Sequence, residues 1–272
     1  TCILRFEREV QMTAKLSHPN TIMIYDYGLT EEGDFYYAME YIDGLSLDKL
    51  IEQGPLSEGR TIHLLAQLCG SLNEAHQMGL IHRDIKPANV LVTTRGGLCD
   101  FVKLVDFGLV KAVQARSAAI TGDGLAVGTP LFMSPEAIET PDDVDARSDL
   151  YSVGAIGYYL LTGKYVFVGK SSPEVCMKHL QERPTPPSVR SHRPISADLE
   201  HLILQCLEKD RENRPPTAFD LQQSLLACRE AFTWTEDEAE EWWLNRQAGE
   251  KKKDGDRMLS GVKRSLVGAG LV

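Results

Sequence analysis

Residues His82–Asn89 read HRDIKPAN, and residues Asp106–Gly108 read DFG. The tripeptide alone would be weak evidence, but the two motifs together at this distance are specific. Two short runs between them, at 90–92 and 101–105, are rich in β-branched and other apolar residues, which is typical of short strands. The sequence therefore predicts two polar loops, each attached to a strand of a small sheet.

The residues before these loops predict a leading helix, a β-hairpin and a long helix. Apolar residues fall on one helical face over residues 6–16. The runs 21–27 and 35–42 are rich in β-branched and aromatic residues, and a turn-like segment separates them, as in a hairpin. The long helix is expected to begin after a Ser57 cap and to stop at Gly79.

Beyond the DFG motif the hydrophobic periodicity is mainly helical, and proline-rich loops separate the segments. The expected helices span residues 145–161, 173–181, 197–207 and 217–228. The sequence contains no internal repeat. A small mixed region is therefore followed by a larger helical one.

The composition is that of an ordinary water-soluble globular chain. The 272 residues are 43% hydrophobic and 25% charged, enough for a core that needs no disulfide or metal. The formal net charge of −10 provides no basic field to attract nucleic acid, so we expect no nucleic-acid partner. None of the six cysteines forms a C-x-x-C pair, which is typical of reduced cysteines in a cytoplasmic protein.

Three further motifs accompany HRDIKPAN and DFG: Gly128–Pro130, Ser134–Glu136 and Arg214–Pro215. Together the motifs resemble the serine/threonine protein kinases, most closely the eukaryotic-type kinases of bacteria, over about residues 1–230. The resemblance implies an α+β, two-lobe, protein-kinase-like fold with a complete, mainly helical C-lobe. The implied domains are a partial N-lobe (helix C plus β-hairpin) with hinge at 1–43, the C-lobe at 44–230 and a charged linker at 231–272.

The resemblance implies ATP-dependent phosphorylation of serine or threonine residues on protein substrates, with Mg²⁺ as the metal ion. Asp84 would orient the acceptor hydroxyl and receive its proton, and Lys86 would lie beside the γ-phosphate. Asn89 and Asp106 would hold Mg²⁺, a hard cation that prefers oxygen ligands. Thr129 would contact Asp84 and Lys86. Lysine at position 86 is typical of the serine/threonine subclass rather than the tyrosine one.

The run MEYIDG, which begins at Met39, resembles the hinge between the kinase lobes, where adenine would lie. Backbone groups of Glu40 and Ile42 would hydrogen-bond the adenine edge. Met39 would be the gatekeeper and Leu91 would pack against the ring, although ordinary core packing would explain the same two side chains. Glu9 aligns with the helix C glutamate that pairs with an ATP-holding lysine, and an exposed helix glutamate is the alternative.

The resemblance also implies regulation. Arg83 directly precedes Asp84, an arrangement that goes with activation-loop phosphorylation, because arginine binds a phosphate through charge-assisted hydrogen bonds. Thr121 is the expected phosphosite and Ser117 the second choice. An unmodified flexible loop is the alternative.

Three residues are expected to have structural roles. Glu136 and Arg214 would form a buried ion pair that ties the end of the activation segment to the last helices. Asp149 would anchor the backbone of the HRDIKPAN loop from its helix. We expect Arg214→Ala to destabilise the C-lobe.

The chain departs from the family at its start. It contains no G-x-G-x-x-G loop and no V-A-I-K-like segment, so it holds no lysine partner for Glu9. We therefore expect a truncated N-lobe, and an active parent protein of which residues 1–272 alone are weakly active or inactive. A noncatalytic pseudokinase or scaffold that binds a protein partner remains open. A small-molecule phosphotransferase is disfavoured by Lys86 and by the three further motifs.

The last forty residues differ in character. Residues 236–241 are mainly acidic, and residues 251–264 are mainly basic, which is typical of a solvated linker. An uncharged end at 265–272 follows the basic run, so membrane attachment beyond the C-terminus remains open. The tryptophans lie in this region and would anchor a docked helix or bind a partner; they are Trp234, Trp242 and Trp243.

Overall fold

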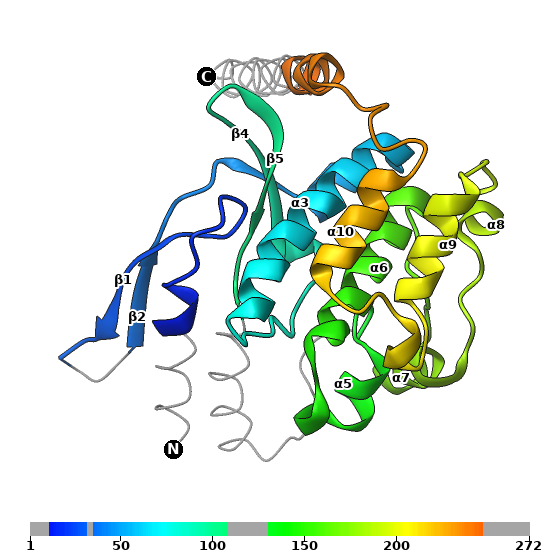
Figure 1. Cartoon of the computed structure of the whole chain (residues 1–272), viewed down its shortest axis with the longest axis horizontal. Coiled ribbons are helices and arrows are strands. Elements are labelled where there is room, and N and C mark those ends of the chain that lie inside the picture. Colours follow the sequence, from blue (N-terminus) through cyan, green and yellow to red (C-terminus); the bar gives the residue numbers. More distant parts are fainter. Residues whose placement is uncertain (1–10, 32–34, 108–129, 247–272) are drawn as a thin grey trace, which may run out of the picture.

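The computed structural model describes residues 11–31, 35–107 and 130–246 (Figure 1). Its first sheet is the antiparallel hairpin of β1 (Ile24–Leu29) and β2 (Phe35–Met39). Its second is antiparallel, with strand order β3 (Gly44–Ser46), β4 (Val90–Arg95) and β5 (Leu98–Leu104). In Figure 1 the hairpin lies apart from the cluster of α3, α6, α9 and α10, and the second sheet lies between the two.

Helices make up most of the remaining described chain. They are α2 (Leu47–Ile51), α3 (Glu58–Gln77), α5 (Pro135–Glu139), α6 (Ala146–Thr162), α7 (Ser172–Gln181), α8 (Pro187–Ser191), α9 (Ala197–Cys206) and α10 (Ala218–Ala227). Three short 3-10 turns occur at Pro87–Asn89, Pro141–Asp143 and Arg211–Asn213. Residues 11–13 and 236–246 are also helical. The expected long helices are therefore present, with ends within a residue or two of the expected bounds.

Helix α3 shows why the sequence signals were sufficient. The Ser57 hydroxyl accepts a hydrogen bond from Arg60 N at 3.3 Å and so caps the first turn. Gly79 follows the helix with a φ of +74°, a conformation that glycine adopts without strain. The short strand β3 and helix α2 were not predicted, because elements of three and five residues have too little periodicity to detect.

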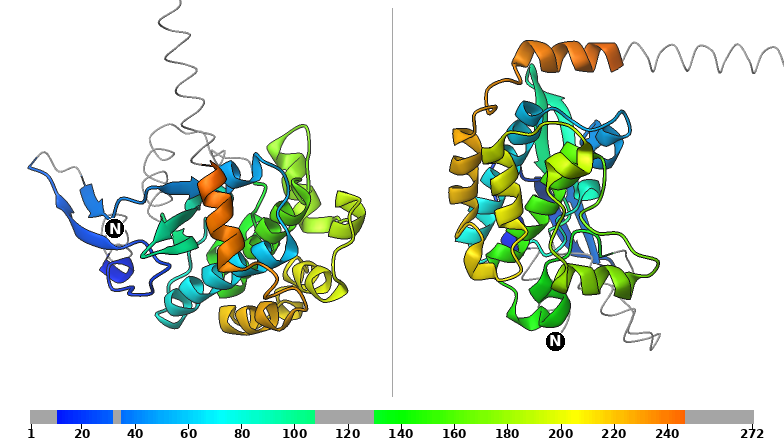
Figure 2. Two further views of the ribbon diagram at one scale, coloured as in Figure 1. Left: turned by 90° about the horizontal axis from the view of Figure 1, so that it is seen from above. Right: turned by 90° about the vertical axis from the view of Figure 1, so that its right-hand side faces the viewer.

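The core of the helical region forms around α6, which is almost entirely buried. Two glycines bring α6 close to α9. A Cβ atom at Gly154 would lie 2.5 Å from Cys206 Cβ, and one at Gly157 would lie 2.5 Å from Ile203 Cδ1. Any larger residue at these two positions would push the helices apart. Figure 2 shows α6 enclosed by the other helices of this region.

The hairpin is attached to the second sheet by the residues just before it. Ile22 N donates to Leu104 O at 2.9 Å, and Leu104 N donates to Asn20 O at 2.7 Å. The predicted strand at 21–27 therefore begins later, at Ile24, because its first residues pair with β5 instead of β2. Several large apolar side chains of the hairpin are exposed, with Tyr25 at 65%.

The described cysteines agree with a reduced protein, since all of them are free thiols: Cys69, Cys99, Cys176, Cys206 and Cys228. Across residues 11–31, 35–107 and 130–246, none of the helices combines the length and the apolar character that a membrane span requires.

Candidate active site

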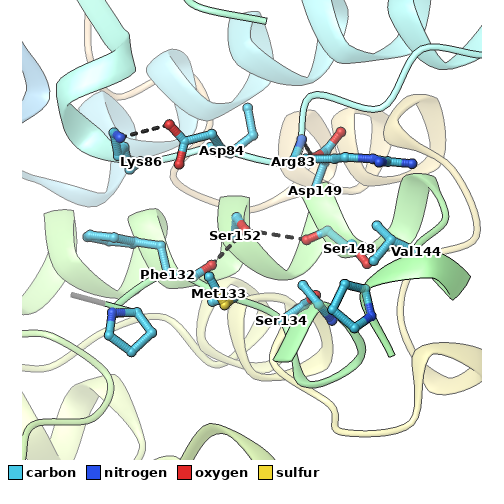
Figure 3. Close-up of a pocket in the computed structure, with 14 residues that line it drawn as sticks. Arg83, Asp84, Lys86, Phe132, Met133, Ser134, Val144, Ser148, Asp149 and Ser152 are labelled. Atoms are coloured by element: carbon cyan, nitrogen blue, oxygen red, sulfur yellow. Dashed lines mark hydrogen bonds and ion pairs between the residues drawn. The ribbon is translucent and has the colours of Figure 1, made fainter. Parts of the chain in front are cut away.

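The HRDIKPAN loop brings three polar side chains together. Lys86 Nζ lies 2.7 Å from Asp84 Oδ2 (Figure 3). Asn89 Nδ2 donates to the same oxygen at 3.0 Å. Asn89 Nδ2 also donates to Asp84 O at 2.8 Å. The 3-10 turn makes this arrangement possible, because Asn89 N bonds to Lys86 O and folds the loop back on itself. The two donors fix the Asp84 carboxylate and leave its Oδ1 without a donor among the described residues.

Asp149 of α6 anchors the backbone of this loop. Its carboxylate accepts hydrogen bonds from the backbone N–H groups of His82 and Arg83, both at 2.9 Å, and His76 Nε2 lies 2.8 Å from it. Burial alone would raise the pKa of Asp149, but the hydrogen bond and charge of His76 lower it below its ordinary value. Arg83 has a φ of +64°, which is strained for a residue with a side chain. The Asp149 hydrogen bonds offset that strain.

Asp106 follows β5 and lies beside the same loop. Val105 N donates to Asn89 O at 2.9 Å, and His82 Nε2 lies 3.0 Å from Val105 O. The His82 ring also packs against Phe107, with 4.6 Å between ring centroids. Burial lowers the pKa of His82, which keeps the ring neutral near pH 7. These contacts hold Asp106, with a φ of +60°, close to the loop.

The oxygen atoms at this place fit a magnesium ion that arrives with phosphate. Asn89 uses its Nδ2 for Asp84, and within the described chain neither Asn89 Oδ1 nor the Asp106 carboxylate accepts a hydrogen bond. No group of three or more His, Cys, Asp and Glu side chains in that part of the chain could hold a metal ion. Mg²⁺ is commonly bound through one or two protein oxygens, waters and substrate phosphates. The donor set is consistent with that mode of binding.

The segment predicted as the hinge is fastened through the side chain of Glu40. This carboxylate accepts a hydrogen bond from Met23 N at 2.9 Å and forms ion pairs with Arg95, at 3.2 Å, and with Lys103. Burial lowers the pKa of Lys103 below its ordinary value, although the hydrogen bond to Glu40 partly raises it again. Glu40 N donates to Met23 O, so within the described residues the C=O of Glu40 is the backbone group left for a ligand.

The three other predicted adenine contacts are not core residues. Met39 is 43% exposed, and Ile42 and Leu91 are half-buried. Leu91 pairs with Ser46 between β4 and β3, which places it directly beyond the hinge. These side chains are therefore partly accessible within the described residues, as the predicted adenine contacts require.

A cavity lies between the HRDIKPAN loop and α5 (Figure 3). Asp84 and Lys86 lie on one side of it, and residues 132–134 on the other. Ser152 of α6 fixes that second wall, because its hydroxyl donates to Phe132 O at 2.7 Å. The Asp84 carboxylate thus lines a space with both hydroxyl-bearing and apolar walls.

Glu136 and Arg214 form a bidentate ion pair, with Nη1–Oε1 and Nη2–Oε2 distances of 2.7 and 2.8 Å. The Ser148 hydroxyl also donates to Glu136. Burial alone would raise the pKa of Glu136, but the bonds from Arg214 and Ser148 lower it. The Arg214 guanidinium further donates to three backbone carbonyls, those of Arg147, Glu208 and Lys209. The pair is therefore surrounded by hydrogen bonds on both sides.

Four predicted site residues lie outside the described residues: Glu9, Ser117, Thr121 and Thr129. Three further residues support the site and were not predicted from the sequence: His76, Arg95 and Lys103. Lys103 was detectable in principle, because a lysine between apolar neighbours in a predicted strand is rarely buried without a partner. His76 and Arg95 carry no comparable signal, since their partners are distant in the sequence.

Comparison with known proteins agrees with this geometry. Residues 4–226 match the family model described as "Protein kinase domain". The chain is 40% identical to the serine/threonine-protein kinase PknB of Mycobacterium tuberculosis over 227 residues, which cover 82% of this chain and 35% of that protein. It is 41% identical to the serine/threonine-protein kinase pkn3 of Myxococcus xanthus over 231 residues, or 83% of this chain and 42% of pkn3.

Among solved structures, Rad53 1–466 in complex with AMP-PNP matches with a TM-score of 0.66 and 25% identity, over 80% of this chain and 53% of Rad53. The fold is thus the α+β, two-lobe protein kinase fold with a mainly helical C-lobe. The chain belongs to the protein kinase family. Its relatives in the bacteria are serine/threonine kinases, and the chain spans between a third and a half of the length of the two described above.

Proposed function

We propose that this chain is part of an enzyme that transfers the γ-phosphoryl group of ATP to serine or threonine residues of protein substrates. One observation carries the proposal: Lys86 and Asn89 both bind the Asp84 carboxylate at the edge of a cavity large enough for a peptide side chain. A carboxylate held in this way can orient an acceptor hydroxyl and take up its proton.

The neighbouring residues supply positive charge and metal ligands. Lys86 lies beside the transferred phosphoryl group and offsets its negative charge. Asn89 and Asp106 would hold Mg²⁺, which would neutralise charge on the phosphates. In this proposal Thr129, which lies outside the described residues, would contact Asp84 and Lys86 from the activation segment. Positioning and charge stabilisation, rather than covalent catalysis, account for the reaction.

The hinge binds adenine in this proposal. The C=O of Glu40 and the backbone of Ile42 bind the adenine edge, Met39 is the gatekeeper, and Leu91 supports the ring. The exposure of Met39 and the half-burial of Ile42 and Leu91 support this assignment. Glu9, which lies outside the described residues, would pair with an ATP-holding lysine in this proposal.

Phosphorylation of Thr121, or of Ser117, regulates the enzyme in this proposal. Arg83 is an exposed cation next to Asp84, and its backbone is fixed by Asp149. A phosphate bound to Arg83 would therefore be connected to the loop that carries Asp84.

The test measures transfer of labelled phosphate from ATP to a mixed serine/threonine peptide library in the presence of Mg²⁺. Both the 272-residue chain and the whole gene product are assayed, and we expect the chain alone to be the slower. Asp84→Asn keeps the shape of the side chain but removes its charge, and we expect a loss of at least about 100-fold. Glu182→Gln, at an exposed carboxylate away from the site, is the matched control.

Equal transfer by the wild type and by Asp84→Asn would overturn the catalytic role of Asp84. If the whole gene product binds nucleotide but transfers no phosphate, the proposed enzymatic function is overturned. A noncatalytic scaffold that binds a protein partner is then favoured. Phosphotyrosine as the product would overturn the serine/threonine assignment.

A further inference from the structure

All three tryptophans of the chain lie beyond residue 226, where the match to the kinase family model ends. They converge on one buried ion pair, Arg60–Asp100, which joins α3 to β5. In Figures 1 and 2 the helix of residues 236–246 lies across the end of the β4–β5 hairpin, apart from the helical cluster. Residues 234–246, which lie within the region expected as a charged linker, are thus docked on the described chain.

The Asp100 carboxylate is completely buried and is saturated with donors. Arg60 Nε and Nη2 each donate to it at 2.8 Å. Trp234 Nε1 donates to Oδ2 at 3.0 Å, and Trp243 Nε1 donates to Oδ1 at 2.8 Å. A buried carboxylate with unfilled acceptor sites would be costly, and an indole N–H can only donate. Asp100 therefore depends on the two tryptophans as well as on Arg60.

The surface around this pair is shaped for the segment. The Arg60 guanidinium lies 4.0 Å from the ring centre of Trp242 and 4.7 Å from that of Trp234, within the range of cation–π attraction. A Cβ atom at Gly59 would clash with Thr233 Oγ1 and would lie 2.8 Å from the backbone N of Trp234, so only glycine lets the two backbones approach this closely.

The docked segment also lies next to the hinge. Trp243 and Arg246 line one cavity together with residues 41–45, which follow Glu40. A second connection runs through β5, which carries Asp100 near its start and Lys103 three residues later, and Lys103 binds the Glu40 carboxylate. The segment therefore contacts the hinge region directly and also contacts the strand that fastens it.

We propose that residues 233–246 form a latch whose docking on Arg60 and Asp100 positions the hinge for nucleotide binding. This inference rests on the proposed function, because it requires adenine to bind at the hinge. Trp234 and Trp243 are positioning residues here, since they act on the nucleotide through Asp100, β5 and the hinge. Thermodynamic linkage makes the effect reciprocal, so bound nucleotide must stabilise the docked latch by the same factor.

The wild-type chain itself provides the first test. Because every tryptophan lies in the latch, its intrinsic fluorescence reports latch docking alone. Mg·AMP-PNP is titrated into the chain while calorimetry measures binding in parallel. We expect a saturable blue shift of the tryptophan emission with the same midpoint as the calorimetric curve. Binding of AMP-PNP without any change in emission would overturn the latch.

The second test removes only the two donors to Asp100. The double variant Trp234→Phe, Trp243→Phe keeps aromatic rings at both positions and keeps Trp242 as the reporter. We expect its Kd for Mg·AMP-PNP to rise about 5-fold. Leu244→Ala, on the same helix and with a side chain that is 58% exposed, is the matched control and should leave the Kd unchanged.

The outcomes separate this proposal from the proposed function. If the wild type, the double variant and the control bind AMP-PNP equally well, the latch proposal fails and the kinase function stands. If the wild-type chain and the whole gene product bind no AMP-PNP, the proposed function fails and the latch proposal fails with it. Circular dichroism confirms that each variant is folded before its Kd is compared.

Discussion

Two buried arginine–carboxylate pairs among the described residues differ in which groups satisfy their remaining hydrogen-bond donors or acceptors. In Arg214–Glu136, the remaining guanidinium donors bind backbone carbonyls of the C-lobe. In Arg60–Asp100, the remaining carboxylate acceptor sites bind indole N–H groups of a segment that follows the last helix of the C-lobe. The first pair is therefore completed by the fold that surrounds it. The second is completed by a segment that can in principle detach.

This difference predicts different costs when one partner is removed. Breaking a buried pair is expensive because the remaining charge stays buried without a partner. A charge that water can reach costs less free energy when its partner is removed, because water solvates it. The Arg214–Glu136 pair cannot open to water without disturbing the C-lobe. We therefore expect removal of one of its partners to cost more stability than the same change in the Arg60–Asp100 pair.

Arg214→Ala should have the largest effect. The substitution leaves Glu136 without its bidentate partner and removes three further hydrogen bonds to backbone carbonyls. We expect the free energy of unfolding to fall by about 3–5 kcal/mol, measured by urea denaturation. Arg211→Ala, which removes a more exposed arginine and its pair with Asp143, should cost under about 1 kcal/mol. Equal losses in the two variants would contradict the structural role of Arg214.

Asp100→Asn should have an intermediate effect. The amide cannot accept all four hydrogen bonds, and Arg60 loses its counter-charge. Release of the latch lets water reach both groups, so we expect a loss of only about 2 kcal/mol. The tryptophan emission should shift to the red at the same time. Asp237→Asn, at an exposed carboxylate of the same segment, is the control. Unchanged emission in Asp100→Asn would show that the second pair does not hold the segment.

The pH dependence of stability should show the smallest effect and applies to the first pair. The pKa of Glu136 in the folded protein lies below its ordinary value of 4.5, so the unfolded chain takes up this proton first as the pH falls. The stabilisation is complete above about pH 4.5 and is lost as the pH falls through the lowered pKa. Below pH 4.5, the wild type should lose stability more steeply than Glu136→Gln, by at most about 1.4 kcal/mol per pH unit. Parallel curves would contradict the lowered pKa.

Local signals in the sequence were enough for most of the helices. Ser57 and Gly79 marked the two ends of α3, because capping and the left-handed conformation depend on residues close in the chain. The HRDIKPAN loop was predictable for a related reason. Its 3-10 turn spans few residues, so Asp84, Lys86 and Asn89 meet through local geometry.

The sequence by itself thus determined the family, the order of the longer helices and the residues of the HRDIKPAN loop, because these depend on short-range patterns. Only the tertiary structure decided the partners of Lys103, Arg60 and Asp100. Lys103 meets Glu40 across 63 positions, and Asp100 meets Trp243 across 143. No periodicity connects residues so far apart. Their pairing follows from the need of each buried charge for a partner once the strands and helices have packed.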